Sequence, residues 1–293
     1  MDISIAGFFG NSPHRDLAYI KDFSQTIESL GFKSLSLPEH VIFFAKYESS
    51  YPYTEDGKPN WDPETGIYDP LFVAQVASQH TSTLRFVTGV LILTQRPALL
   101  TAKEVLTLDH LSNGRFDLGV GSGWSWEEYA ALGVPFENRG GRLDEYIESM
   151  RIAWREERAT YHGQFVNFEN VVLNPKPISE GGPPILIGGD STAAMKRAAR
   201  LGDGWYGWWA QPDIEQHLNN LRSIMNDAGR DVSDDDFSFR LGLPLKSLDP
   251  QVINDHVQQA TDLGIDELIL APPIPVRDFD RHLSSVAGAA GLI

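Results

Sequence analysis

The 293-residue sequence predicts an α/β protein of the (β/α)8 TIM-barrel class. Short apolar runs alternate with longer segments of helical periodicity, and eight such strand–helix units can be traced along the chain. A chain somewhat longer than about 250 residues suits eight units of this kind. A doubly wound open sheet is the alternative topology. We expect residues 1–293 to form one barrel domain.

The first part of the chain reads as strand, helix, strand. Apolar residues at helical spacing fill residues 15–30, and Gly31 follows as a helix stop. This helix joins a strand at residues 3–7 to a second strand at residues 33–37, which Pro38 closes. The helix is long enough for a parallel crossover between the two strands.

The middle of the chain repeats this order. A helix at about residues 70–79 leads into an apolar third strand at residues 84–93. Pro97 opens the next helix, and a Ser-Asn-Gly sequence at residues 112–114 ends it. The fourth strand is then residues 115–120.

The remaining units follow after an amphipathic helix at residues 139–157. The expected strands are residues 184–188, 204–208, 237–243 and 266–270, and the expected helices are residues 191–201, 214–228 and 252–263, with a tail that is helical at best.

Two irregular insertions interrupt this rhythm, one after the second strand at residues 39–68 and one before the fifth strand at residues 160–183. The first holds four aromatic residues from Tyr47 to Trp61 and shows no clean period. Long irregular segments in compact domains are often functional, and the aromatic content argues against disorder. We expect a lid, with a passive surface loop as the alternative. The second insertion suggests a short hairpin around residues 165–173.

The composition excludes several kinds of partner. With 24 Lys and Arg against 40 Asp and Glu, the net charge of −16 repels nucleic acid and anionic membranes. The absence of cysteine excludes disulfides, thiolate metal sites and cysteine nucleophiles. There is no basic leader and no apolar run of the roughly 18 residues that a membrane helix needs. We therefore expect a cytoplasmic protein.

In a barrel, the residues that follow each strand meet at one rim, where ligands bind. The candidate rim residues are Glu39, His40, Gly89, Val90, Ser122, Gly123, Trp124, Gly188, Gly189, Trp208 and Trp209.

The stretch NGRFDLGVGSGWSWEE, residues 113–128, joins the fourth strand to this rim. Three alternating glycines are followed at once by two tryptophans and two carboxylates. Glycine at such spacing exposes backbone amides and lets the backbone approach a flat or bulky group. A tight strand–helix joint packed by Trp124 and Trp126 is the alternative.

His40 is the only one of the eight histidines that we place at the end of a strand. Imidazole titrates near about pH 6.5 and can give or take a proton under physiological conditions. Glu39 beside it is suited to orient a partner, so these two residues are the candidate catalytic pair. A simple hydrogen bond from His40 to backbone is the alternative.

A second rim motif combines a strand, the glycine pair Gly188-Gly189 and the start of a helix at Ser191 and Thr192. Bare amides and hydroxyls at a helix N-terminus form an anion site. A plain N-cap role for Ser191 is the alternative.

Several signatures are absent. No His-x-His follows the first strand, and no spacing of histidines and carboxylates suggests a metal cage, so we predict no metal. Ser122 lies one residue from each flanking glycine and is not a nucleophile elbow. The rim therefore suits a cofactor that brings its own chemistry.

Three segments resemble the bacterial luciferase-like superfamily, and within it most of all the oxidoreductases that use the deazaflavin coenzyme F420. They are LILTQRPALLTAKEVLTLDHLSNGRFDLGVGSGW, EEYAALGVPFENRGGRLDEYIESMRIAW and PPILIGGDSTAAMKRAARLGDGW. The resemblance runs from about residue 3 to residue 245 and implies a (β/α)8 barrel.

The resemblance also implies roles for individual residues. His40 would handle a proton near the reactive ring carbon, with Glu39 as its acidic neighbour. Gly89-Val90 would be a non-proline cis peptide behind the ring. The remaining cofactor contacts would be Ser122 and Gly123 at the ring or ribityl chain, and Gly188, Gly189, Ser191 and Thr192 at the phosphate.

One position departs from the resembled pattern. Some relatives place a glutamate immediately after the Ser/Thr-Gly pair, where this chain has Trp124. This departure suggests a flat, apolar substrate, and Trp124, Trp208 and Trp209 are candidates to line its pocket. Core packing is the alternative for each of them.

The expected function is hydride transfer between F420 and a small apolar or aromatic substrate. The alternatives are an FMN-dependent two-component monooxygenase and a non-catalytic flavin-binding barrel. The expected partners are a small-molecule substrate and a flavin or F420 reductase, and a homodimer is common in the resembled family.

Overall fold

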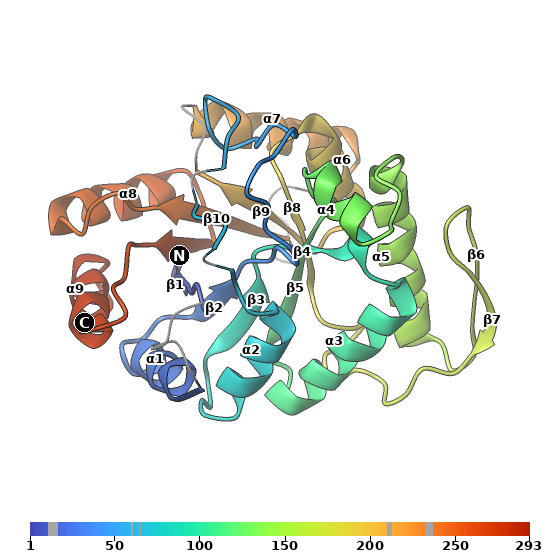
Figure 1. The fold of residues 1–293 in the computed structure, drawn as a ribbon, viewed down its shortest axis with the longest axis horizontal. Helices are drawn as coiled ribbons and strands as arrows, with labels where there is room; N and C mark the ends of the chain where they lie inside the picture. Colours follow the sequence, from blue (N-terminus) through green and yellow to red (C-terminus); the bar gives the residue numbers. More distant parts are fainter. Residues whose placement is uncertain (11–16, 60, 65, 210–212, 232–236) are drawn as a thin grey trace.

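The computed structural model describes the chain except for residues 11–16, 60, 65, 210–212 and 232–236. In the described part, eight parallel strands close into a barrel (Figure 1). Pairing of β3 with β5, at Phe86 and Phe116, closes the ring. The barrel strands are β1 (Asp2–Ala6), β2 (Ser34–Leu37), β3 (Arg85–Thr88), β5 (Phe116–Gly121), β8 (Ile185–Gly188), β9 (Gly204–Trp208), β10 (Ser238–Pro244) and β11 (Glu267–Ala271). The predicted TIM barrel is confirmed.

Helices surround the strands on the outside of the barrel (Figure 1). They are α1 (Leu17–Ser29), α2 (Pro70–Ser78), α3 (Ala98–Ser112), α4 (Trp126–Ala131), α5 (Arg139–Arg155), α6 (Thr192–Leu201), α7 (Ile214–Asp227), α8 (Pro250–Asp262) and α9 (Phe279–Ala289). The predicted stop of α3 is confirmed, because Asn113 caps it in the left-handed conformation. None of the described helices combines the length and the apolar character that crossing a membrane requires.

The prediction of one continuous strand at residues 84–93 is wrong. The chain leaves β3 through a cis peptide at Gly89-Val90 and then forms the two-residue strand β4 (Leu91–Ile92) and a 3-10 turn, η1 (Leu93–Gln95). An uninterrupted apolar run cannot reveal such a break. The sequence also did not indicate α4, which is only six residues long.

The second insertion contains the expected hairpin, with an earlier start than predicted. Strands β6 (Ala159–His162) and β7 (Asn167–Val171) pair antiparallel and project away from the barrel (Figure 1).

Charged side chains fill the barrel at the N-terminal end of the strands. Arg240 lies 2.8 Å from Asp117 and 3.1 Å from Glu267. The carboxylate of Glu267 also accepts hydrogen bonds from Ser4 and Ser34. An apolar layer with Val87, Leu186 and Ile269 lies within the same barrel. Buried charges of this kind persist only when they are paired, and here the pairing closes this end of the barrel.

Candidate functional site

His40 leaves the carboxyl end of β2 and meets a carboxylate from α4. Its Nδ1 lies 3.1 Å from Oε2 of Glu128, whose side chain is 1% exposed. A carboxylate accepts hydrogen bonds, so this contact favours the tautomer or charge state with a proton on Nδ1. Nε2 is then the ring nitrogen left to exchange a proton with a ligand.

Glu128 is held in its ionised form. Burial alone would raise its pKa, but the hydrogen bond and charge of His40, together with the Ile42 amide, bring the pKa below its ordinary value. Its other oxygen accepts hydrogen bonds from the amides of Val41 at 2.7 Å and Ile42 at 3.1 Å. One carboxylate therefore positions both the imidazole and the start of the insertion.

Glu39 points to a different set of partners. Its carboxylate forms an ion pair with Arg96 and accepts a hydrogen bond from the Ile92 amide. Arg96 also lies 2.6 Å from Asp69, the N-cap of α2. Burial raises the pKa of Glu39 even though Arg96 opposes this. These contacts tie the end of β2 to β4 and α2.

Aromatic residues of the first insertion pack over His40. The rings of Trp61, Phe43 and Trp124 have centroids 5.3, 5.6 and 5.8 Å from the imidazole. Trp124 comes from the loop after β5, and the other rings come from residues 39–68. We refer to Phe43, Tyr47, Tyr51, Trp61 and Trp124 as the aromatic cluster.

Glu127 fastens this insertion to α4. Its carboxylate accepts hydrogen bonds from the Ser49 amide at 2.8 Å and the Ser49 hydroxyl at 2.7 Å. Burial alone would raise the pKa of Glu127, but the hydrogen bonds from Ser49 and Ser125 lower it to about 2. Glu127 and Glu128 are candidate site residues that were not singled out from the sequence. Their only signal was two adjacent carboxylates directly after the glycine-rich strand.

The cis peptide at Gly89-Val90 agrees with the implication of the resemblance. Below Gly89 lie the hydroxyls of Ser36 and Tyr206, which are 2.8 Å apart. A Cβ at position 89 would come within 2.6 Å of the Tyr206 hydroxyl. Only glycine therefore allows the backbone to approach this pair so closely.

Val90 occupies the space that the glycines of the rim leave open. A Cβ at Gly188 would lie 2.7 Å from Val90, and one at Gly121 would lie 3.0 Å from it. The glycine spacing predicts that the backbone can approach a flat or bulky group. In the structure, these glycines first make room for Val90, whose side chain forms part of the rim surface.

Ser122 and Gly123 form a fixed turn at the same rim. The Ser122 carbonyl accepts a hydrogen bond from the Tyr129 hydroxyl at 2.7 Å, and the Gly123 carbonyl accepts one from Arg139 at 3.2 Å. Gly123 has a φ of +64°, which favours glycine. Both residues are half-buried.

The turn after β8 has the features of an anion site. Gly189 has a φ of +112°, and Ser191 caps α6 by accepting a hydrogen bond from the Ala194 amide at 3.2 Å. The N-cap role is therefore real, but it occupies only one of the first-turn amides. The others, beginning at Thr192, have no acceptor within the helix and are available to an anion.

The two tryptophans at the end of β9 lie on opposite faces of the sheet. Trp208 lies two residues after Tyr206 and therefore points to the same face, the barrel interior, where it packs over Gly242. Trp209 stacks edge-on against His256 of α8, with centroids 5.5 Å apart. Trp208 therefore shares the rim with Trp124, whereas the contacts of Trp209 support packing between strand and helix.

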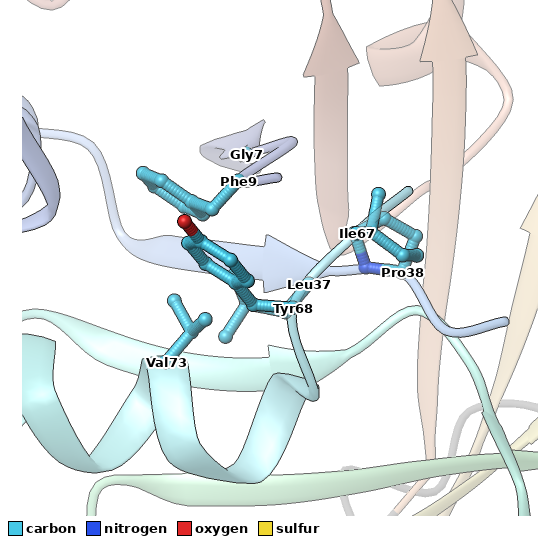
Figure 2. Close-up of a pocket in the computed structure, with 7 residues that line it drawn as sticks. All are labelled: Gly7, Phe9, Leu37, Pro38, Ile67, Tyr68 and Val73. Carbon is cyan, nitrogen blue, oxygen red and sulfur yellow. The ribbon is translucent and has the colours of Figure 1, made fainter. Parts of the chain in front are cut away.

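A small pocket lies beside the rim, between the ends of β1 and β2 and the start of α2 (Figure 2). It is lined by Gly7, Phe9, Leu37, Pro38, Ile67, Tyr68 and Val73. Apart from the Tyr68 hydroxyl, these side chains are apolar and cannot orient a charged cofactor. The described residues also contain no group of three His, Cys, Asp or Glu side chains placed to hold a metal ion.

The model of the luciferase-like monooxygenase family matches residues 1–271. The chain belongs to this family. It is 35% identical over 248 residues to an uncharacterized protein of Mycobacterium tuberculosis, with 84% of each chain covered. It is also 40% identical over 129 residues to an FMNH(2)-dependent dimethylsulfone monooxygenase of Pseudomonas fluorescens, covering 43% of this chain and 34% of the relative.

The fold is similar to that of a solved F420-dependent secondary alcohol dehydrogenase. The TM-score is 0.75 at 16% identity, with 99% of this chain and 98% of the other covered. Identity this low supports the fold alone. Members of this family are oxidoreductases and monooxygenases. The sequence relatives include an FMNH(2)-dependent enzyme, and the F420-dependent dehydrogenase is similar in fold.

Proposed function

We propose that this protein is an oxidoreductase that transfers a hydride between coenzyme F420 and a small apolar or aromatic substrate. The observation that carries the proposal is the His40–Glu128 pair, with Nδ1 and Oε2 3.1 Å apart beneath the aromatic cluster. A proton-exchanging group, an ionised carboxylate that orients it and aromatic walls that exclude water are what such a reaction needs.

The cofactor supplies the hydride chemistry when it is bound. We assign its ring to the surface formed by Gly89, Val90, Ser122 and Gly123, and its phosphate to the turn at residues 188–192. The fit rests on two features of this chain: the first-turn amides of α6 and the half-buried turn at Ser122 and Gly123.

His40 then delivers or accepts the proton that accompanies hydride transfer, through Nε2. Glu128 holds the imidazole in position through the contact with Nδ1. Glu39 acts through Arg96 by fixing the backbone at the end of β2. Trp124 stands where some relatives carry a glutamate, so we assign it, with Trp208, to an apolar substrate wall.

The FMN-dependent monooxygenase is the second candidate, favoured by the 40% identity over 129 residues to an FMNH(2)-dependent enzyme. Such an enzyme would need reduced flavin from a separate reductase. Residues that hold a flavin phosphate and ring would also hold those of a deazaflavin, so binding must separate the two.

The test is a titration of the purified protein with F420 and with FMN, followed by tryptophan fluorescence. Trp61 and Trp124 lie in the aromatic cluster beside His40, so a ligand there should quench them. We expect saturable quenching by F420 at lower concentration than by FMN. Tight binding of FMN without a response to F420 would reject the proposal in favour of the monooxygenase.

A further inference from the structure

Asp190 lies within the turn assigned to the cofactor phosphate, between Gly189 and Ser191. Its side chain is only 8% exposed. Neither carboxyl oxygen has a hydrogen-bond partner of good geometry among the described residues. The Nε2 atom of His217 on α7 lies 3.8 Å from Oδ1 and also lacks such a partner. A buried polar group of this kind calls for an explanation.

The elements around Asp190 provide no fixed positive charge. α7 contributes His217, and burial lowers the pKa of this imidazole. The insertion contributes Tyr53, whose pKa burial raises, with Asp190 adding to the effect. β9 contributes the Trp208 amide. Within the described part of the chain, no lysine or arginine forms an ion pair with Asp190.

We propose that Asp190 selects the charge of the ligand tail, favouring a singly charged phosphodiester over a doubly charged phosphomonoester at residues 188–192. The proposal rests on the assignment of this turn to the cofactor phosphate. Repulsion between a buried carboxylate and a nearby anion grows with the charge of the anion. A phosphomonoester gains its second charge near about pH 6, whereas a diester never does.

The preference depends on pH because Asp190 itself titrates. Burial raises its pKa to about 7, against a smaller lowering by the Trp208 amide. Below this value the neutral carboxyl donates a hydrogen bond to either phosphate. Above it, the carboxylate repels both and repels the dianion more. F420 carries a phosphodiester and FMN a monoester, so this residue favours the deazaflavin coenzyme.

The experiment compares a flavin ring and a deazaflavin ring, each carrying either a phosphomonoester or a phosphodiester, at pH 6 and pH 8. The probes are FMN, its methyl phosphodiester, F420, and the deazaflavin 5′-phosphate monoester, with binding followed by tryptophan fluorescence. At pH 8 we expect the diester of either ring to bind about tenfold more tightly than its monoester. At pH 6 the two tails should bind within about threefold of each other.

Asp190→Asn should abolish the pH 8 preference, and Asp190→Ser provides a second variant in case Asn disturbs the turn. Ser191→Ala is the matched control, because it should weaken both tails equally. Equal binding of mono- and diesters to the wild type at pH 8 overturns the proposal, as does a preference that survives in both Asp190 variants.

The two proposals fail differently. If the flavin pair shows the ester preference but neither deazaflavin binds, the choice of F420 is wrong and the role of Asp190 stands. If F420 binds tightly but Asp190→Asn changes both tails alike, the cofactor is right and the role of Asp190 is wrong. Failure of all four probes to bind overturns both.

Discussion

The two ends of this barrel differ in how some of their buried polar groups are paired. At the N-terminal end, Arg240 pairs with both Asp117 and Glu267. At the C-terminal end, the indole nitrogen of Trp124 and the carboxyl group of Asp190 lack well-formed hydrogen bonds among the described residues. At the first end, Arg240 supplies a charged partner for both carboxylates. Polar groups without partners at the C-terminal end are tolerated where a bound ligand can supply their hydrogen bonds.

We expect the largest effect on stability from a substitution at the N-terminal end of the barrel. Arg240→Ala leaves Asp117 and Glu267 buried without their shared partner, and we expect it to lower the free energy of unfolding by about 3–5 kcal/mol. Urea denaturation measures this loss. Lys33→Ala, which removes the exposed pair between Lys33 and Asp2 at 3.2 Å, is the control and should cost at most about 1 kcal/mol. Equal losses would mean that the ion pairs of Arg240 contribute no more to stability than an exposed pair does.

At the C-terminal end of the barrel, we expect a loss of comparable size in the catalytic rate. His40→Ala removes the proton-exchanging group and should lower kcat about 10²–10⁴-fold with little change in cofactor affinity or unfolding temperature. Glu128→Gln keeps the shape but removes the charge opposite the imidazole. It should lower kcat less than His40→Ala does, because the imidazole stays in place but loses its charged partner. An unchanged kcat would leave Glu128 with a purely structural role.

Replacing Asp190 should raise the free energy of unfolding, whereas replacing Arg240 should lower it. Burial raises its pKa to about 7, so the folded protein holds this proton more tightly than the unfolded chain does. Stability is therefore lost as pH rises from about 4 through about 7. We expect Asp190→Asn to gain roughly 2–4 kcal/mol at pH 8 and almost nothing at pH 4. The measurement is chemical denaturation at both values, and an equal gain at the two pH values would contradict the account.

The smallest expected effect concerns the insertion. Glu127→Gln weakens the hydrogen bonds to Ser49 and should destabilise the closed insertion by about 1–2 kcal/mol without unfolding the barrel. Faster hydrogen exchange at the Ser49 amide would report this change. Because the pKa of Glu127 is lowered to about 2, the wild-type anchor is intact above about pH 4.5 and is lost as pH falls toward 2. Cluster tryptophan fluorescence that does not change over this range would count against the anchor.

The barrel could be predicted because the patterns that indicate its strands and helices are local in the sequence. Apolar runs, helical periodicity and stops such as Asn113 each reside within a few neighbouring residues. Local patterns do not reveal the break after β3, where only the resemblance implied a cis peptide. The residues that lie beneath Gly89, Ser36 and Tyr206, come from other strands.

The candidate site divides in the same way. His40 could be singled out from its place after a strand, and the anion turn from its glycines and hydroxyls. The role of Glu128 depends on a contact across 88 positions of sequence, and the burial of Asp190 depends on α7 and β9 packing around it. Such contacts between distant segments have no local pattern.

We propose that His40, the turn at Ser122 and residues 188–192 hold one cofactor, and a crystal structure of the protein with F420 would show whether they do. We expect the phosphodiester at the N-terminus of α6 beside Asp190, and the ring between Val90 and the imidazole of His40. A cofactor bound away from His40, or with its phosphate at another turn, would contradict it.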